Sequence, residues 1–177
     1  MKFLIYLAPF LVFGFFLFYL ILPTLDFPNP PPDSIQSREP ADTETVSRRA
    51  YFTNMTRDEV INYYRDQFDK PKLNFLKYPS LRLNYLPEEA QTLIRDQTRS
   101  TYLEEIVHPF RESIFINGFE PKQAKDEIWY DKQHFRQKII IRYVTSDLFF
   151  RLTIAFLTFI ISVLLLRQWI FWFRKLC

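Results

Sequence analysis

The chain has few of the residues on which most recognisable active sites depend. Its 177 residues include only two glycines, two histidines and one cysteine. Two glycines exclude the glycine-rich loops that bind nucleotide phosphates, and one cysteine excludes both a disulfide within the chain and a CxxC motif. GxSxG and HExxH motifs are missing as well. The sequence therefore predicts no enzyme, and we expect no cofactor.

Acidic residues are missing from both ends of the chain, where two long apolar runs occur instead. Residues 3–22 form an uncharged run that is about 30 Å long as a helix, which matches the hydrocarbon core of a bilayer. No small-residue cleavage site follows, so we interpret this run as an uncleaved signal-anchor. Residues 148–173 form the second run. We expect two transmembrane helices that enclose a soluble domain.

Two arginines interrupt the second run, but both lie near its ends. From there the side chains of Arg151 and Arg167 reach the headgroup layers and avoid most of the mid-bilayer cost, about 2.5–3.5 kcal/mol. An intramembrane binding charge at Arg151 is the less favoured alternative. The expected membrane-interface group consists of Arg151, Arg167, Trp169, Trp172, Arg174 and Lys175.

The basic residues beside the two runs predict the orientation of the chain. Lys2 precedes the first run, and Arg167, Arg174 and Lys175 lie at the end of the second. Short basic flanks stay in the cytoplasm, so both termini are predicted to be cytoplasmic and the central domain extracytoplasmic, at a bacterial plasma membrane. All 20 acidic residues lie between the runs, so the net charge of +3 comes from the membrane flanks. It indicates no nucleic-acid binding.

Prolines concentrate immediately after the first run. Residues 23–49 hold few large apolar side chains, and Pro30-Pro31-Pro32 favours polyproline II structure. We interpret this segment as a tether, and a ligand for a proline-binding domain is the alternative. Residues 50–146 then have the apolar density of one small domain.

Two segments of this domain carry clear local signals. Thr56 and Glu59 form a capping box, which predicts an amphipathic helix that ends before Pro71. Its apolar face consists of Val60, Ile61, Tyr64 and Phe68. Residues 135–143 alternate between inward and outward positions and predict a strand that pairs with 127–131. The sequence thus predicts an α+β domain, with helices packed on one face of a small antiparallel sheet.

The remaining segments of the domain carry weaker signals. Residues 72–84 supply one or two strand candidates, and Pro87 is expected to start a second helix. Residues 101–107 show helical periodicity, either as a fresh helix or as part of one buried between two surfaces. For residues 109–117, a helix that ends at Asn117-Gly118 is favoured over a hairpin turn at that dipeptide.

One pair of residues has a spacing found among metal ligands. Glu105 and His108 are three positions apart and would share one face of a helix, and His134 would complete a site of two histidines and one carboxylate. More simply, His108 ends a helix before Pro109. The sequence predicts no metal site, and these three residues are weak candidates only.

Two further groups of residues are candidates for contacts with other molecules. Small residues let membrane helices approach closely, and hydroxyls can bond across the interface. The candidates for such packing are Gly14, Ala155, Thr158 and Ser162. Bonds from the two hydroxyls to their own helix are the simpler explanation. Exposed aromatics favour interfaces, and the candidates in the domain are Tyr63, Trp129 and Tyr130.

These features together indicate a class of function and name no reaction. We expect a membrane-anchored extracytoplasmic module for interaction or assembly, as part of a cell-envelope membrane complex. Its expected partners are the lipid bilayer and either a membrane protein or a second copy of the chain. A module that binds cell-wall polysaccharide is the alternative, and a membrane-bound metal-dependent enzyme is the least favoured one.

Overall fold

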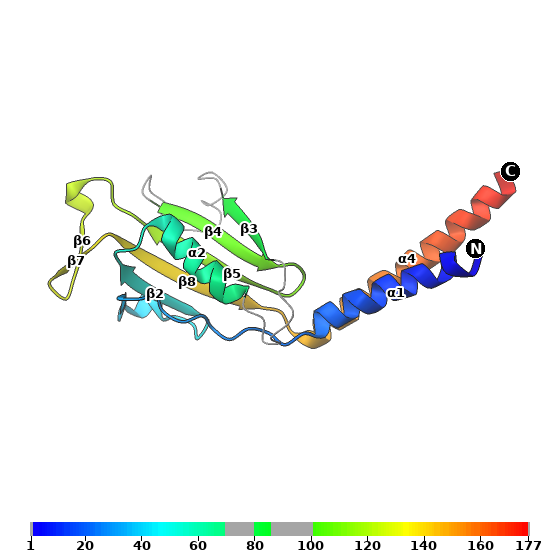
Figure 1. The fold of residues 1–177 in the computed structure, drawn as a ribbon, viewed down its shortest axis with the longest axis horizontal. Coiled ribbons are helices and arrows are strands. Elements are labelled where there is room, and N and C mark those ends of the chain that lie inside the picture. Colours follow the sequence, from blue (N-terminus) through cyan, green and yellow to red (C-terminus); the bar gives the residue numbers. More distant parts are fainter. Residues whose placement is uncertain (1, 70–79, 86–100, 177) are drawn as a thin grey trace. The chain divides into compact units, whose positions relative to one another are not determined.

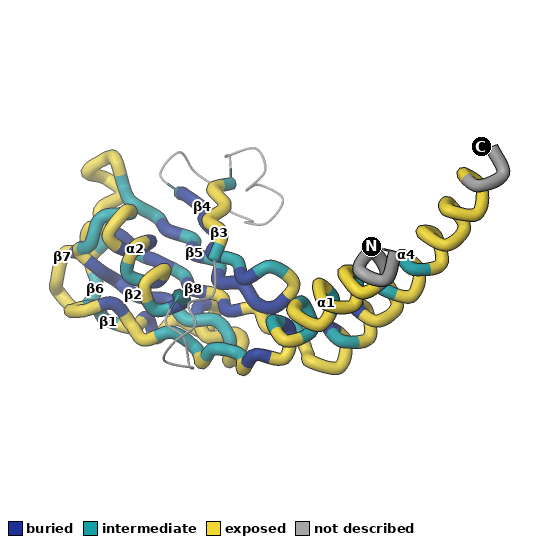
Figure 2. The backbone as a smooth tube through the Cα atoms, turned by 45° about the vertical axis from the view of Figure 1, so that its right-hand side comes forward, coloured by how far each residue is buried: buried dark blue, intermediate teal, exposed yellow. Residues whose placement is uncertain are grey.

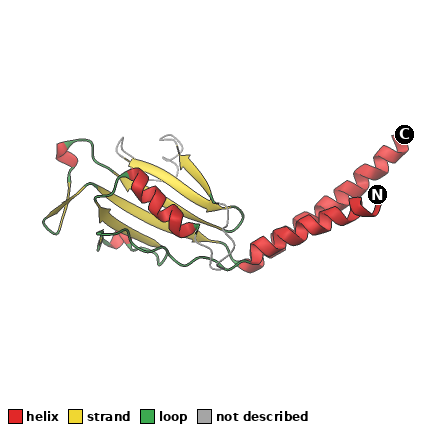
Figure 3. Cartoon of the chain, in the orientation of Figure 1, coloured by secondary structure: helices red, strands yellow, loops and turns green. Residues whose placement is uncertain are grey.

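The computed structural model describes residues 2–69, 80–85 and 101–176, and the chain divides into two compact units. One unit consists of Met1–Pro23 and Ser146–Cys177, and the other is the domain Thr24–Thr145. The described residues form three α-helices and a six-stranded antiparallel sheet (Figure 1, Figure 3). The predicted α+β class is confirmed at this level.

The sheet of the domain has the strand order β1-β2-β8-β5-β4-β3. Its strands are β1 (Ile35–Gln36), β2 (Arg48–Thr53), β3 (Leu81–Tyr85), β4 (Thr101–His108), β5 (Glu112–Phe119) and β8 (Gln137–Thr145). A separate hairpin, β6 (Ile128–Tyr130) and β7 (Gln133–Phe135), leads into β8. Two short 3-10 helices are η1 (Pro40–Asp42) and η2 (Ala124–Asp126).

Helix α2 (Arg57–Phe68) lies across one face of the sheet (Figure 1). The predicted capping box is confirmed: Glu59 N–H donates to Thr56 Oγ1, and Thr56 N–H donates to Glu59 Oε2 at 2.6 Å. Its predicted apolar face is buried and meets the isoleucines of β4, β5 and β8 (Figure 2). Each such side chain contributes about 1.5–3 kcal/mol when it is fully buried. Packing between this face and the sheet therefore forms the core.

The strand predicted over residues 135–143 is confirmed as the end of β7 and most of β8. Its inward residues are buried, namely Phe135, Ile139, Ile141 and Tyr143. The predicted pairing with residues 127–131 is made by β7, in which Phe135 lies opposite Ile128. β8 itself pairs with β2 and β5 at the centre of the sheet.

Residues 101–119 form strands where the sequence analysis predicts helices. The helix over residues 101–107 is wrong because β4 occupies Thr101–His108. Most of β4 is buried on both faces, so apolar residues do not alternate along it and the strand period is concealed. The helix favoured at 109–117 is wrong as well. Arg111 N–H donates to His108 C=O in a tight turn, in which Phe110 has φ 63°, and β5 follows.

Gly118 lies within β5 and is neither a helix end nor a turn residue. A Cβ at this position would lie 2.1 Å from Cζ of Tyr102, the residue directly opposite on β4. The Tyr102 hydroxyl donates to Gln137 Oε1 at 2.7 Å, which holds the ring over the Gly118 backbone. Glycine suits this position because the Tyr102 ring packs directly on its backbone, and a Cβ would displace the ring.

The segment predicted as a tether packs against the domain. Ile35 of β1 pairs with Phe52 of β2, and Phe27 packs against the core. The Tyr63 hydroxyl donates to Pro30 C=O at 2.6 Å. The compact unit begins at Thr24, whereas the sequence analysis places the start of the domain at residue 50. Side chains distant in the sequence hold this segment, and its composition gives no sign of them.

Two predicted elements fall mainly outside the described residues. The helix expected after Pro87 lies outside them altogether. Of the strand candidates in residues 72–84, the described part coincides with the start of β3.

The other unit consists of α1 (Lys2–Ile21) and α4 (Leu148–Leu176), which lie side by side (Figure 1, Figure 2). The Phe13 ring stacks on Phe159 with 4.0 Å between centroids and meets Phe156 edge-on at 5.3 Å. Residues 148–173 are long and apolar enough to cross a membrane. The described apolar part of α1, Leu7–Ile21, is shorter, so the second predicted span is not supported.

Candidate functional site

The β6–β7 hairpin extends from one end of the six-stranded sheet (Figure 1). Its turn residues are Asp131 and Lys132, with φ of 48° and 65°, and Tyr130 pairs with Gln133 across them. Two positive φ angles give the tight turn whose twist matches that of the flanking strands. Residues other than glycine adopt this conformation at a cost of about 1–2 kcal/mol each. Contacts of the two strands must therefore hold the turn in place.

One side of the hairpin is packed on the sheet. The Tyr130 ring stacks on Phe52 of β2 with 4.3 Å between centroids, and the Phe135 ring lies 5.9 Å from Phe52. Lys138 Nζ lies 5.5 Å from the centre of the same Phe52 ring. Aromatic pairs of this kind stabilise by about 0.5–1.5 kcal/mol each. The domain therefore fixes the orientation of the hairpin.

The other side of the hairpin presents Trp129 to solvent. The Trp129 side chain is 64% exposed. Its ring meets the imidazole of His134 edge-on at 5.3 Å, and the two residues are directly paired across the hairpin. Consecutive side chains of a strand point to opposite faces, so Trp129 points outward because Tyr130 packs inward.

The other two candidate aromatics are half-buried. Tyr63 on α2 packs against the core, and its hydroxyl is used by Pro30 C=O. Tyr130 covers Phe52. Of the three aromatics selected from the sequence, the structure therefore leaves Trp129 with a ring accessible to another molecule.

The three weak metal candidates are not brought together. Glu105 and His108 lie on opposite faces of β4, because residues three positions apart alternate in a strand. The Tyr85 hydroxyl donates to Glu105, and the His108 ring stacks on Phe68 at 4.2 Å. His134 is exposed in β7. Within the described residues, no group of three histidine, cysteine, aspartate or glutamate side chains is arranged to hold a metal ion.

His108 belongs to a buried polar cluster beside the β4–β5 turn. Its Nδ1 lies 3.2 Å from Glu112 Oε1, and Arg111 Nη2 donates to the same oxygen at 2.9 Å. All three side chains are inaccessible to solvent. Buried polar groups require such partners, so the cluster is explained as support for the turn.

A second buried carboxylate, that of Glu104, connects α2, β3 and β4. Arg57 donates to Oε1 through Nε and Nη2 at 2.8 and 2.6 Å, and Arg82 donates to both oxygens. Burial by itself raises the pKa of Glu104, but the hydrogen bonds and charges of Arg82 and Arg57 outweigh it and hold that pKa below its usual value. Sequence reasoning did not find this cluster, because its members lie on three separate elements.

The predicted membrane-interface residues differ in their surroundings. Arg151 is 8% exposed, and its Nε and Nη1 atoms have no hydrogen-bond partner among the described residues. Arg167, Trp169 and Trp172 are exposed. The side chains of Arg174 and Lys175 lie outside the described residues.

The small residues selected for helix packing lie mostly outside the contact between α1 and α4. A Cβ at Gly14 would meet nothing within 4 Å, and Thr158 and Ser162 are exposed. The Ser162 hydroxyl donates to Thr158 C=O at 2.8 Å within the same helix, which is the simpler explanation offered above. Ala155 is buried. The ring contacts between the helices are made by phenylalanines, which are too frequent in α1 to mark one face.

Comparison with known protein families, with characterised proteins and with solved structures finds no match for this chain. No relative therefore indicates a function, so a proposal for the function has to come from the arrangement of the described residues.

Proposed function

We propose that this protein is a membrane-anchored module that contacts a partner protein outside the cytoplasm through its β6–β7 hairpin. The observation that carries the proposal is the 64% exposure of Trp129 on a hairpin that Tyr130 fixes to Phe52. Tryptophan is enriched at protein interfaces and among the few residues that dominate binding energy. A hairpin that is already fixed loses little conformational entropy on binding. Assembly within a cell-envelope membrane complex is the expected role.

The position of the hairpin on the chain suits a partner that lies away from the bilayer. β8 runs for nine residues from Gln137 to Thr145, and the hairpin joins it at the Gln137 end. Nine strand residues span about 30 Å. α4 begins at Leu148, beyond the Thr145 end. The hairpin and the membrane helix are therefore attached to opposite ends of the same strand.

We also propose that both apolar helices cross a bacterial plasma membrane. α1 has 20 residues, which is about 30 Å of helix, and it packs along α4 through Phe13. The basic residues Arg167, Arg174 and Lys175 favour a cytoplasmic end for α4. Two successive spans return the chain to the side from which it started, so both ends are cytoplasmic and residues 24–145 are extracytoplasmic.

Thiol labelling in intact cells tests this orientation. Cys177 is the only cysteine, so a membrane-impermeant maleimide should label it only after permeabilisation. Lys125 is exposed on the domain, and the variant Lys125→Cys, made together with Cys177→Ser, should be labelled in intact cells. Labelling of Cys177 without permeabilisation contradicts the orientation.

Photo-crosslinking tests the role of the hairpin. A photoreactive amino acid at Lys132, in the full chain in its own cells, should give one defined protein adduct. Trp129→Ala should reduce that adduct about ten-fold or more, as expected for a dominant interface residue. Phe110→Ala is the control, because Phe110 is 75% exposed on a different turn of the domain. An adduct that survives Trp129→Ala, or the lack of any adduct, contradicts the proposal.

Binding of cell-wall polysaccharide is the second candidate, since an exposed tryptophan also suits a carbohydrate surface. Co-sedimentation of the detergent-solubilised full chain with purified wall polysaccharide separates the two. Sedimentation that depends on Trp129 favours the polysaccharide, and no sedimentation favours the protein partner. A metal-dependent enzyme is not proposed, because Glu105, His108 and His134 do not meet.

A further inference from the structure

Two arginines face each other at the end of β8 that leads to the membrane helix. Arg48 of β2 and Arg142 of β8 are direct partners in the antiparallel pair. Side chains in such a pair share one face of the sheet with their Cβ atoms about 5 Å apart, and like charges there are destabilising. The fold therefore keeps two positive charges together at a cost to its own stability.

Little negative charge within the described residues offsets this pair. Glu44 Oε2 lies 3.3 Å from Arg48 Nη1, and both side chains are partly exposed. Arg48 Nε is buried and has no hydrogen-bond partner in the described part of the chain. Arg142 is exposed, and no described carboxylate lies within ion-pair distance of it. The charge of Arg142 is therefore left for a partner outside the domain.

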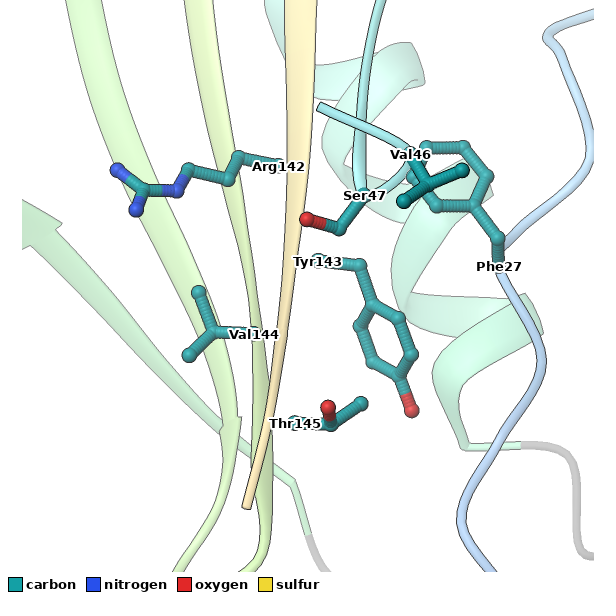
Figure 4. Close-up of a pocket in the computed structure, with 7 residues that line it drawn as sticks. All are labelled: Phe27, Val46, Ser47, Arg142, Tyr143, Val144 and Thr145. Atoms are coloured by element: carbon teal, nitrogen blue, oxygen red, sulfur yellow. The ribbon is translucent and has the colours of Figure 1, made fainter. Parts of the chain in front are cut away.

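Arg142 also lines a cavity of about 390 Å³ at the end of β8. Figure 4 shows Arg142 and Val144 on one side of the strand, and Tyr143 and Thr145 with Ser47 on the other. The guanidinium of Arg142, on the side of the strand that it shares with Arg48, can donate hydrogen bonds to an anion.

Exposed apolar side chains border the same cavity. Val46 is 94% exposed, and Val144 is exposed as well. The Phe27 ring completes the lining, with the Arg49 guanidinium 4.6 Å from its centre. A lipid in the headgroup layer of a membrane is polar at one end and apolar at the other, so a surface that combines positive charge with accessible apolar side chains suits it.

The chain itself limits the distance between this cavity and the apolar helix. Only two residues separate Thr145 from Leu148, the first residue of α4. Three steps of an extended chain cover at most about 11 Å, whereas the polar layer on each side of a bilayer is about 5–7 Å thick. If α4 spans a membrane, the cavity is within reach of lipid headgroups.

We propose that Arg48, Arg142 and this cavity bind the phosphate group of an anionic phospholipid. Guanidinium groups match phosphate oxygens in geometry and charge, and an arginine without a carboxylate partner, such as Arg142, is attracted to an anionic membrane surface. Val46 and Val144 contact the glycerol and upper acyl region of the lipid. The proposal rests on the membrane anchoring given under the proposed function, and it is independent of the partner of Trp129.

Lipid retention by the full chain tests this proposal. The protein in neutral detergent is offered equal amounts of phosphatidylglycerol and phosphatidylcholine, and native mass spectrometry counts the lipids retained. The unaltered chain should retain phosphatidylglycerol in preference, and Arg142→Gln should lower the ratio about five-fold, the factor that one arginine contributes near an anionic surface. Arg136→Gln is the matched control, because Glu120 already neutralises Arg136 at 2.7 Å, and it should keep the original ratio.

Two further measurements guard against simple structural explanations. In phosphatidylcholine nanodiscs, Arg142→Gln should melt at or above the temperature of the unaltered chain, because the repulsion with Arg48 is gone. A lower melting temperature would mean that Arg142 supports the fold, and it would overturn the proposal. Inorganic phosphate at the same concentration as the lipid should leave the lipid ratio unchanged, because free phosphate lacks the glycerol and acyl region that Val46 and Val144 contact. If phosphate at that concentration abolishes the preference, the site binds free phosphate and the lipid proposal is overturned.

The failure of this proposal can be told apart from failure of the proposed function. A chain that does not enter nanodiscs contradicts membrane anchoring and this site with it. A chain that enters nanodiscs but shows the same lipid ratio with and without Arg142 contradicts the headgroup site alone.

Discussion

The two ends of β8 handle positive charge in opposite ways. At the hairpin end, Lys138 Nζ lies 2.7 Å from both Asp42 Oδ2 and Glu39 Oε2. At the end that leads to α4, Arg142 lies opposite Arg48. Where charge is neutralised within the domain, the feature left for contact is aromatic, namely Trp129. Where the chain leads to an apolar helix, Arg48 has Glu44 as a partner at 3.3 Å, but Arg142 has no carboxylate partner among the described residues, which suits an anionic bilayer surface.

The pKa of Lys138 reflects the pairing of its charge with two carboxylates at the hairpin end of β8. Burial by itself lowers this pKa, but the hydrogen bonds and charges of Asp42 and Glu39 outweigh burial and raise it above the usual value. Lys138 therefore remains charged and paired, and it holds η1 against β8. The stability that this charge contributes is present below pH 10.5 and is lost as the pH rises through the higher folded pKa.

The largest effect is expected at Glu104, where the pairing of charges is most complete. Glu104→Gln removes the carboxylate that receives hydrogen bonds from Arg57 and Arg82, and it should lower the free energy of unfolding by about 2–3 kcal/mol. Chemical denaturation of the full chain, followed by tryptophan fluorescence, measures the change. Glu120→Gln, which breaks a surface pair with Arg136, should change it by less than about 1 kcal/mol. Equal losses in the two variants would remove the distinction between buried and surface pairs.

Acid should weaken the same cluster. The folded pKa of Glu104 lies below its usual value of 4.5, so the stability it contributes is present above pH 4.5 and is lost as the pH falls through the folded pKa. The melting temperature of the unaltered chain should therefore fall in this range. The fall should be smaller in Glu104→Gln, which has no carboxyl to titrate. Parallel pH profiles of the two proteins would exclude Glu104 as a source of acid sensitivity.

An intermediate effect is expected from removing one of the two carboxylates that pair with Lys138 at the hairpin end of β8. Asp42→Asn leaves Lys138 with Glu39 only and removes the carboxylate oxygen to which the Ser37 hydroxyl donates at 2.6 Å. The free energy of unfolding should fall by about 1.5 kcal/mol, within the range for hydrogen bonds to charged groups. Denaturant titration of the full chain measures it. Unchanged stability would show that the two ends of β8 do not differ in how their charge is held.

The smallest effect is expected at the end of β8 that leads to α4, and it has the opposite sign. Arg142→Gln should raise the free energy of unfolding by about 0.5 kcal/mol in neutral lipid, because a direct cross-strand repulsion is removed. Added salt should shrink the difference, since it screens exposed charges. A destabilised variant, or a difference that does not depend on salt, would contradict the repulsion.

Local signals in the sequence predict the elements that are stabilised locally. The capping box at Thr56 and the period of α2 are complete within a few residues, and the alternation along β8 reflects its one buried face. β4 is different, because the buried Glu104 is tolerated only through Arg57 and Arg82, on α2 and β3. No pattern within residues 101–108 indicates those partners, so the strand is mistaken for a helix.

The candidate aromatic surface is likewise predictable only where local sequence decides it. The alternation of Trp129 and Tyr130 follows from the sequence once a strand is assumed, but the choice of outward residue depends on Phe52. Tyr63 packs against the core and its hydroxyl donates to Pro30 C=O, a contact that joins two segments that composition assigns to separate regions. The facing arginines emerge only from the register between β2 and β8.

The claim that the two ends of β8 serve different partners is tested most directly by measuring both binding readouts on the same two variants. Trp129→Ala should lose the protein adduct formed from Lys132 and keep the preference for phosphatidylglycerol. Arg142→Gln should keep the adduct and lose the lipid preference. A single variant that abolishes both readouts, or two variants that leave both intact, would contradict the division of the domain into a protein-binding end and a membrane-binding end.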